Sequence, residues 1–130
     1  MTEKEAAAYS PNILAFYGDS IYEELVRKRI VLEHQTNAGR LHELAVKRVR
    51  ASYQSEAVSV IEPLLSEREA DILRRGRNAG GISVPKSSNP GEYRRATALE
   101  TLFGYLALCE KQERVIELFN MICEKLPIDE

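Results

Sequence analysis

The stretch from Ser10 to Arg29 reads SPNILAFYGDSIYEELVRKR and predicts a long helix. A serine before a proline is a typical helix start, because Ser10 can cap the free amides and Pro11 fits the first helical position. Apolar and small residues then recur at helical spacing. They predict one buried face of this helix, formed by Leu14, Gly18, Ile21 and Leu25.

The same helix carries apolar residues on its other side, at Phe16, Tyr22 and Val26. A helix on the surface of a single subunit is not expected to be apolar on both sides. We therefore predict that this helix contributes to a contact between two subunits, and that the protein is a homodimer.

Outward from this helix, apolar residues recur at helical spacing over residues 36–49, 52–65, 66–75, 93–109 and 112–125. Ser66 with Glu69 three residues later is a capping box, which marks a helix start. No alternating run bounded by turn residues indicates a strand. The sequence predicts an all-α fold of about six or seven helices in a single domain over residues 1–130, with residues 1–10 as a loose tail.

Residues 76–91 contain four of the seven glycines together with two prolines. We interpret Gly76 as a left-handed stop for the preceding helix. A connection of this length and composition is usually functional or disordered. The sequence therefore predicts a mobile loop over residues 76–91.

The composition is that of an ordinary globular protein, with 130 residues of which 44% are hydrophobic and 29% are charged. The first ten residues contain no apolar run, and no later apolar stretch reaches the roughly 18 residues of a spanning helix. We therefore expect a cytoplasmic protein without a membrane segment. Cys109 and Cys123 lie in apolar helical contexts without metal-ligand spacing, which indicates small buried thiols.

The net charge is −2, but the basic residues are concentrated in one segment. Residues 74–95 contain a single acid, Glu92, and carry a charge of +5, which leaves −7 for the rest of the chain. The basic residues of the segment are Arg74, Arg75, Arg77, Lys86, Arg94 and Arg95. Such a patch on an acidic protein can attract a polyanion such as RNA, although a merely solvated charged face has the same composition.

Two acids stand alone in otherwise uncharged helical runs. Asp19 is the only charged residue from Ser10 to Tyr22, and Glu100 is the only one from residue 96 to residue 109. Because a buried carboxylate without a partner is costly, each must pair with an arginine from another helix, face water or bind a cation. Magnesium favours one or two carboxylates together with water and phosphate oxygens, so a shared cation is one of these three explanations.

Three ordered motifs resemble one known family. LAFYGDSIY at residues 14–22 resembles the ribonuclease III signature, and ALETLFG at residues 98–104 resembles the second acidic motif of that family. Between them, LRRGRNA at 73–79, VPK at 84–86 and YRRAT at 93–97 resemble the short branch called Mini-ribonuclease III. The resemblance covers about residues 13–126.

The resemblance implies that Asp19 and Glu100 hold a catalytic magnesium ion, with manganese as a substitute. It also implies that double-stranded RNA is cut to 5′-phosphate and 3′-hydroxyl ends. The full-length enzymes have further acids where this chain has Ala15 and Thr97. The Mini branch shares both losses, which argues for membership of that branch rather than for inactivity.

Assembly and substrate follow from the same resemblance. Family members are homodimers with two active sites along one RNA-binding valley, and the Mini branch matures the precursor of large-subunit (23S) ribosomal RNA. No double-stranded-RNA-binding domain is expected after the last helix. Contacts to the RNA backbone are expected from Arg74, Arg75, Arg77, Asn78, Lys86, Arg94 and Arg95.

Two alternatives stay open at the level of sequence. A non-catalytic RNA-binding module of the same fold, attached to a ribosome, would keep Asp19 and Glu100 as remnants. A helical protein-interaction domain would explain the amphipathic helices, but not a basic, glycine-rich loop beside two isolated acids. A nuclease assay on duplex RNA with magnesium separates the three interpretations.

Overall fold

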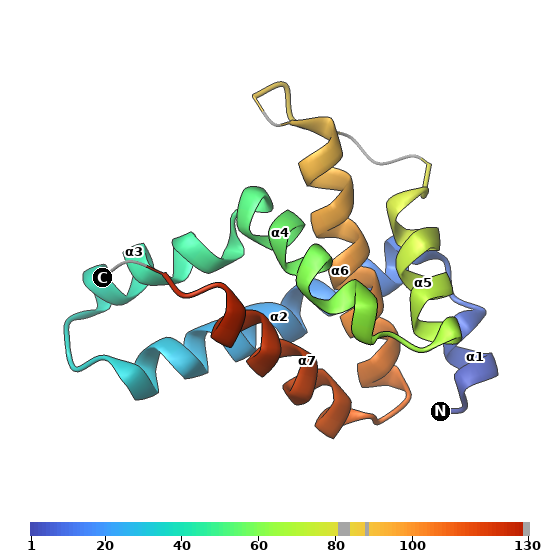
Figure 1. Cartoon of the computed structure of the whole chain (residues 1–130), viewed down its shortest axis with the longest axis horizontal. Helices are drawn as coiled ribbons and strands as arrows, with labels where there is room; N and C mark the ends of the chain where they lie inside the picture. The colour runs from blue at the N-terminus through green and yellow to red at the C-terminus, as the bar shows by residue number, and fades with distance from the viewer. Residues whose placement is uncertain (81–83, 88, 129–130) are drawn as a thin grey trace.

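The computed structural model describes residues 1–80, 84–87 and 89–128. The prediction of an all-α fold is confirmed, since the described residues form helices and no strand occurs among them (Figure 1). The elements are α1 (Glu3–Ala7), α2 (Pro11–Glu33), α3 (Ala38–Val49), α4 (Ala51–Ile61), the 3-10 helix η1 (Glu62–Leu64), α5 (Glu67–Arg77), α6 (Pro90–Leu108) and α7 (Gln112–Lys125).

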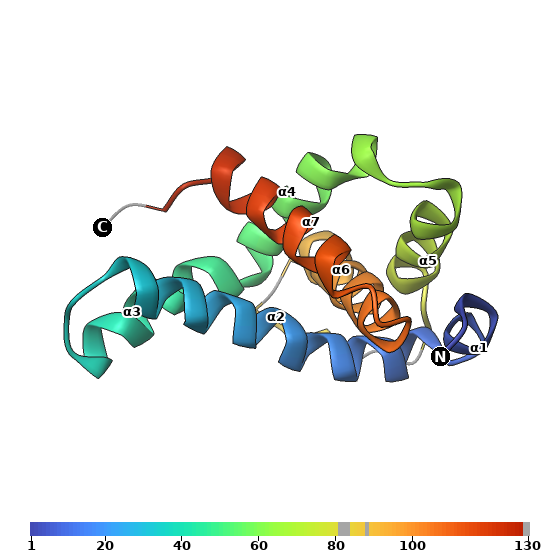
Figure 2. The same cartoon turned by 90° about the horizontal axis from the view of Figure 1, so that it is seen from below.

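Helix α6 is the central element of the fold. Figure 1 shows it between α4 and α5, and the view from below in Figure 2 shows α2 running across it. Helices α2, α4, α5 and α7 all contact α6. Its side chains at Leu99, Leu102, Phe103 and Leu106 are fully buried. A helix that is apolar on all sides is stable only in such a central position.

The predicted starts of two helices are confirmed. Ser10 Oγ accepts a hydrogen bond from the amide of Ile13 at 3.3 Å, and Pro11 is the first residue of α2. Ser66 and Glu69 form the capping box of α5 in both directions. Local side-chain chemistry therefore determines where these two helices begin.

Gly76 does not end the preceding helix. It is buried inside α5, which continues to Arg77 and is capped by Asn78. A Cβ atom at Gly76 would lie 2.6 Å from Thr101 Oγ1, so this glycine allows α5 to approach α6 closely. The interpretation of Gly76 as a left-handed stop was wrong, because the sequence does not distinguish a glycine at a helix contact from one at a helix end.

Two further boundaries differ from those predicted. Helix α6 begins at Pro90 rather than near residue 93, because Asn89 Oδ1 accepts a hydrogen bond from the amide of Glu92 at 3.1 Å. The break between α3 and α4 lies at Arg50, earlier than the predicted restart at Ser52. Both differences amount to a few residues and leave the order of the helices unchanged.

Residues 1–10 are not a loose tail, as the sequence had predicted. Residues 3–7 form α1, whose capping box joins Thr2 and Glu5. Ala6 is fully buried, and Arg75 Nη1 of α5 donates a hydrogen bond to the Ala7 carbonyl oxygen at 3.0 Å. The segment is ordered by tertiary contacts, which its own composition does not reveal.

The connection between α5 and α6 is shorter than the predicted loop over residues 76–91, because each helix extends into that range. Residues 81–83 and 88 lie outside the described residues, and mobility of the connection stays a prediction. One described contact links the connection to α2: Asn12 Nδ2 donates a hydrogen bond to the Gly80 carbonyl oxygen at 3.1 Å.

Two of the three residues that were predicted to form an outer face of α2 do not lie on the surface. Tyr22 and Val26 are buried within the single chain, and the Tyr22 ring contacts Phe103 and Phe119 at centroid distances of 5.9 and 5.8 Å. Only Phe16 is on the surface, with 85% of its area exposed. The long α2 helix contacts α3, α5 and α6, so more than one of its sides is covered within the chain.

The prediction of a buried thiol is confirmed for Cys123, whereas Cys109 is only half-buried, and both thiols are free. Among the described helices, none is both long enough and apolar enough to cross a lipid bilayer.

Candidate active site

Helices α2 and α6 cross at a pair of glycines. A Cβ atom built on Gly18 would lie 1.7 Å from the carbonyl oxygen of Glu100. On the other helix, a Cβ atom built on Gly104 would lie 2.0 Å from the carbonyl oxygen of Leu14. No side chain fits between the two backbones at either point. Because Asp19 follows Gly18 directly, this crossing places Asp19 close to Glu100.

The two carboxylates share one open hollow on the surface, with a volume of about 310 Å³. Asp19 is exposed, whereas Glu100 is partly buried. The hollow is lined by Asn12, Ala15, Phe16 and Asp19 of α2 and by Tyr93, Thr97 and Glu100 of α6. The two acids that stand alone in the sequence therefore meet in space.

The pKa of Glu100 is strongly shifted from its ordinary value. Its pKa is raised from the ordinary value of 4.5 to about 8, with burial as the largest cause. The negative charge of Asp19 and a hydrogen bond with the Asp19 side chain raise this pKa as well, whereas a hydrogen bond from Gln54 lowers it. At neutral pH and without a cation, Glu100 therefore holds a proton.

Neither acid has a basic partner among the described residues. No ion pair there involves Asp19 or Glu100. The nearest ion pair along α2 joins Glu23 Oε1 to Arg27 Nε at 3.0 Å, and the Arg27 side chain is largely exposed whereas the Glu23 side chain is partly exposed. An ordinary buried ion pair does not account for either Asp19 or Glu100.

The donor atoms of the hollow fit one class of metal ion better than another. Within residues 1–80, 84–87 and 89–128, no group of three or more His, Cys, Asp or Glu side chains is placed to hold a metal. A structural zinc site, which needs about four protein ligands, therefore does not fit. Two carboxylates at an open surface fit magnesium, which keeps several water ligands and also binds phosphate oxygens.

Comparison with known proteins identifies the family. The model of the family described as Ribonuclease III domain matches residues 12–111, a range that contains both Asp19 and Glu100. The chain belongs to the ribonuclease III family. This membership makes it an endoribonuclease, and the ribonuclease III match ends before α7.

Relatives of this ribonuclease III domain carry the name of the Mini branch. The chain is 41% identical over 110 residues to Mini-ribonuclease 3 of Symbiobacterium thermophilum, with 85% of each chain covered. It is 40% identical over 128 residues to Mini-ribonuclease 3 of a Thermoanaerobacter species, with 96% of this chain and 90% of the relative covered. The predicted resemblance to the Mini branch is confirmed.

A solved structure supports the same fold. The crystal structure of a protein from Fusobacterium nucleatum has a TM-score of 0.81 to this chain and is 33% identical to it. The alignment covers 91% of this chain and 94% of that one. The ribonuclease III fold therefore extends over nearly the whole chain.

Three arginines of the basic segment of this ribonuclease III domain bind other parts of the protein. Arg74 pairs with Asp71 at 2.5 Å. Arg75 donates to the carbonyl oxygens of residues 7 and 9 at 3.0 and 3.5 Å, and so holds the chain around α1 against α5. Arg95 donates to the Ser55 carbonyl oxygen at 3.1 Å and joins α6 to α4. These contacts restrict what Arg75 and Arg95 can offer to RNA.

The other predicted RNA-binding residues are exposed. In the described part of the chain, no ion pair or hydrogen bond involves the side chains of Arg77, Lys86 or Arg94. Asn78 is exposed at the end of α5, and its backbone amide donates to the Arg74 carbonyl oxygen at 3.0 Å. Among the described residues of the basic segment, Arg77, Lys86 and Arg94 are therefore the charged side chains that are free to meet a polyanion.

Several lining residues of the hollow were not predicted from the sequence. Tyr93, Thr97 and Glu100 are separated by four and three residues, which puts them on one face of α6. Asn12 lies seven residues before Asp19 and shares its face of α2 in the same way. Both Asn12 and Tyr93 could have been predicted by listing the residues that lie one or two helical turns away from each acid on the same helix.

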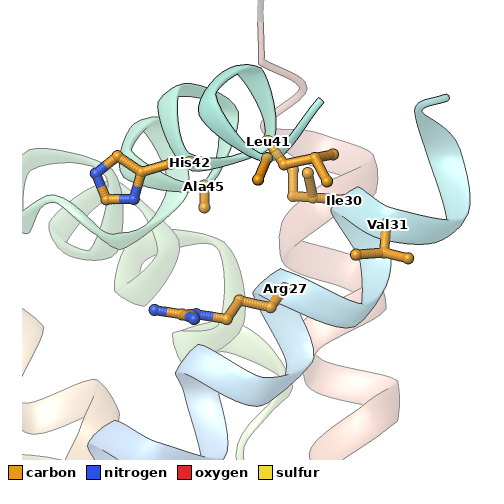
Figure 3. Close-up of a pocket in the computed structure, with 7 residues that line it drawn as sticks. Arg27, Ile30, Val31, Leu41, His42 and Ala45 are labelled. Carbon is orange, nitrogen blue, oxygen red and sulfur yellow. The ribbon is translucent and has the colours of Figure 1, made fainter. Parts of the chain in front are cut away.

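A second hollow, with a volume of about 220 Å³, lies between α2 and α3 (Figure 3). Its lining residues are Arg27, Ile30, Val31, Ala38, Leu41, His42 and Ala45. Figure 3 shows Leu41 of α3 next to Ile30 of α2. Because no carboxylate lines this hollow and most of its lining is apolar, it suits an apolar side chain rather than a cation.

The raised pKa of Glu100 makes the stability of this ribonuclease III domain depend on pH in a predictable direction. Without metal, folded Glu100 keeps a proton that the unfolded chain releases above pH 4.5, so stability falls as pH rises through about 8. Glu100→Gln removes this loss, and its melting temperature is expected to rise relative to wild type between pH 5 and 8. The expected gain is on the order of a few kcal/mol at pH 8.

Thermal unfolding of both proteins in EDTA, measured at steps of half a pH unit, checks this expectation. Glu124→Gln serves as the control, because Glu124 is exposed on α7 and is not among the groups that shift the pKa of Glu100. A constant difference between Glu100→Gln and wild type across this pH range would mean that Glu100 is ionised throughout.

Proposed function

We propose that this endoribonuclease cuts double-stranded RNA with a divalent cation held by Asp19 and Glu100. Magnesium is the proposed ion, and manganese can replace it. The proposal is carried by the meeting of these two carboxylates at the glycine crossing of α2 and α6, where neither has a basic partner in the described chain. A pair of acids close enough to raise a pKa favours a cation between them.

Each acid has a defined task in this proposal. Both carboxylates hold the ion, so Glu100 releases its proton when a cation binds, and binding tightens as pH rises toward 8. A magnesium ion in such a site supplies an activated water and positive charge beside the reacting phosphate. Hydrolysis joins the water oxygen to phosphorus and breaks the bond to the 3′ oxygen. The ends are a 5′-phosphate and a 3′-hydroxyl.

The substrate we propose is the duplex precursor of 23S ribosomal RNA in the cytoplasm, as the resemblance to the Mini branch implies. The major groove of an A-form duplex is too deep and narrow for side chains to read, so phosphate contacts dominate binding. We propose that most of these contacts come from the exposed side chains of four residues, Arg77, Asn78, Lys86 and Arg94. Arg74, Arg75 and Arg95 contribute less, because each already has a protein partner.

Replacement of Arg77, Lys86 and Arg94 by alanine is expected to weaken binding to all duplex sequences alike. The slope of log affinity against log salt should fall by roughly three units, about one for each lost phosphate contact. Binding is measured in calcium at 50 to 200 mM salt, and Lys4→Ala with Lys125→Ala is the control for loss of surface charge. An unchanged slope would remove these residues from the RNA interface.

We also propose a homodimer whose contact includes the exposed residues of α2. Ile13, Phe16 and Tyr17 are 53, 85 and 39% exposed, and Phe16 also lines the hollow that contains Asp19. Val31, at the opposite end of α2, is 58% exposed and lines the apolar hollow between α2 and α3. In a twofold dimer with antiparallel α2 helices, Phe16 of each protomer can enter that hollow on its partner.

Phe16→Asp is expected to convert the dimer into a monomer. A charge at the centre of an apolar contact should weaken association by at least about 30-fold, as for a typical hot-spot residue. Sedimentation at micromolar concentration should then give the chain mass of 14.7 kDa in place of twice that value. Ile116→Asp, at a 41% exposed position on α7, is the control. A wild-type monomer, or a dimer that survives Phe16→Asp, would contradict the proposal.

A cleavage assay tests the proposed function directly. Duplex RNA with one labelled 5′ end is incubated with the protein in magnesium, in manganese and in EDTA. Cleavage of the duplex in both metals, absence of cleavage in EDTA and no cleavage of a single strand of the same sequence are expected. A wild-type protein that binds the duplex without cutting it in either metal would replace the enzyme with the non-catalytic module.

A further inference from the structure

Gln54 of α4 is a buried amide beside the acidic pair. Only 4% of its surface is exposed, and it belongs to a helix that neither Asp19 nor Glu100 occupies. A hydrogen bond from its side chain lowers the pKa of Glu100, which indicates that the amide lies beside that carboxyl group. A third helix therefore brings a polar group to the site that α2 and α6 form.

The orientation of this amide is set by its other partner. Gln54 Nε2 donates a hydrogen bond to the Val49 carbonyl oxygen at 2.8 Å, just before the break between α3 and α4. If the amide were turned around, Oε1 would face the Val49 carbonyl, and two acceptors would oppose each other. One N–H thus points to Val49, which leaves the second N–H of the same nitrogen for the Glu100 carboxyl group.

The remaining atom of the amide has no partner. Within the described residues, Gln54 Oε1 is fully buried and accepts no hydrogen bond. An unsatisfied buried acceptor is unusual in a folded protein, and a water or an ion is one of its common explanations. A hydrogen-bond donor would satisfy this oxygen, and the water ligands of a cation held by the neighbouring Glu100 are strong donors.

We propose that Gln54 is a positioning residue of the metal site: its Nε2 orients the Glu100 carboxylate, and its Oε1 accepts a hydrogen bond from a water ligand of the cation. The inference rests on the proposed function, because it needs a cation between Asp19 and Glu100. Groups that orient metal ligands in this way typically contribute a factor of 10 to 100 in metal affinity. Gln54 touches neither the RNA nor the reacting phosphate in this proposal.

Two variants separate the two atoms of the amide. Gln54→Met has a similar length and no polar atom, so it should weaken Mn²⁺ binding about 10- to 100-fold. Gln54→Glu keeps an acceptor oxygen but loses the N–H donor to Glu100, so it should lose less Mn²⁺ affinity than Gln54→Met does. Ser52→Ala, an exposed change on the same helix, is the control and should leave the affinity unchanged.

Mn²⁺ binding to the RNA-free protein is measured by the electron paramagnetic resonance signal of free Mn²⁺, below the melting temperature of every variant. If Gln54 serves only to hold the Val49 carbonyl, both variants should melt earlier and bind Mn²⁺ with wild-type affinity, which would overturn the inference. An equal loss of affinity in Gln54→Met and Gln54→Glu would also overturn it. Should Gln54→Met not fold, Gln54→Ala takes its place in the same comparison.

The same titration distinguishes failure of this inference from failure of the proposed function. Asp19→Asn should abolish Mn²⁺ binding whatever the role of Gln54. Wild-type Mn²⁺ affinity in Asp19→Asn would mean that the cation is not held by the acidic pair. The proposed role of Gln54 would then be rejected together with the metal site. Loss of binding in Asp19→Asn with no effect of Gln54→Met would reject the role of Gln54 alone.

Discussion

Asp19→Asn and Glu100→Gln are each expected to lower the rate of duplex RNA cleavage by roughly 10³-fold or more while the protein stays folded. Each change keeps the size and shape of the side chain and removes the charge that holds a cation against a negatively charged phosphate. RNA binding should change little, because the exposed basic residues proposed to contact the RNA are unchanged in both variants. Single-turnover cleavage and duplex binding in calcium are measured for each variant.

The control for this prediction is Glu23→Gln, one turn along the same helix. Glu23 is partly exposed and already pairs with Arg27, so its loss should change the cleavage rate by no more than a few-fold. Melting temperatures of all three variants exclude unfolding as the cause. Near-wild-type cleavage by both Asp19→Asn and Glu100→Gln would leave the family membership intact and show that the active site lies elsewhere.

Gly18→Ala is expected to destabilise the protein by about 3 kcal/mol or more, which lowers the melting temperature by roughly 10 °C or more. The added methyl group would sit 1.7 Å from a backbone oxygen of α6, which cannot rotate away as a side chain can. Helices α2 and α6 must then separate, and Asp19 moves away from Glu100. Cleavage at a temperature where the variant is folded should therefore fall as well.

Gly39→Ala is the matched control, because Gly39 also lies in a helix but is exposed. Its added Cβ would meet only the Asn37 side-chain oxygen, at 3.3 Å. The expected change is no more than about 1 kcal/mol, since alanine has the better helix propensity. If Gly18→Ala were as stable as Gly39→Ala, the close crossing of the two helices would be incorrect.

The two acids of the site were predictable because the sequence itself shows that each stands alone among uncharged residues. Asp19 and Glu100 are the only charges in long uncharged runs, and the motifs around them resemble one family. The starts of α2 and α5 were predictable for a similar reason, since Ser10 and Ser66 act within a few residues of themselves. Where the determinant is local, the sequence is sufficient.

Features that depend on distant contacts were missed or misread. Gly76 resembles a helix end in the sequence, and its role appears only when Thr101 of α6 is found packed against it. Likewise, α1 is held by Arg75, which lies far along the chain. Tyr22 seemed free for a partner subunit because the packing of α7 against it has no local signature. Gln54 carries no sign of its neighbour Glu100, since 46 residues separate them. Each of these depends on how helices meet.

The glycine crossing also bears on how this fold can be redesigned. Where two backbones touch, the spacing of Asp19 and Glu100 follows from peptide geometry and not from the size of any core side chain. A library that varies Leu99, Leu102 and Leu106 can therefore change the melting temperature over a wide range while the spacing of the two carboxylates is kept. In directed evolution of this scaffold, thermal stability and cleavage activity can be selected in separate rounds.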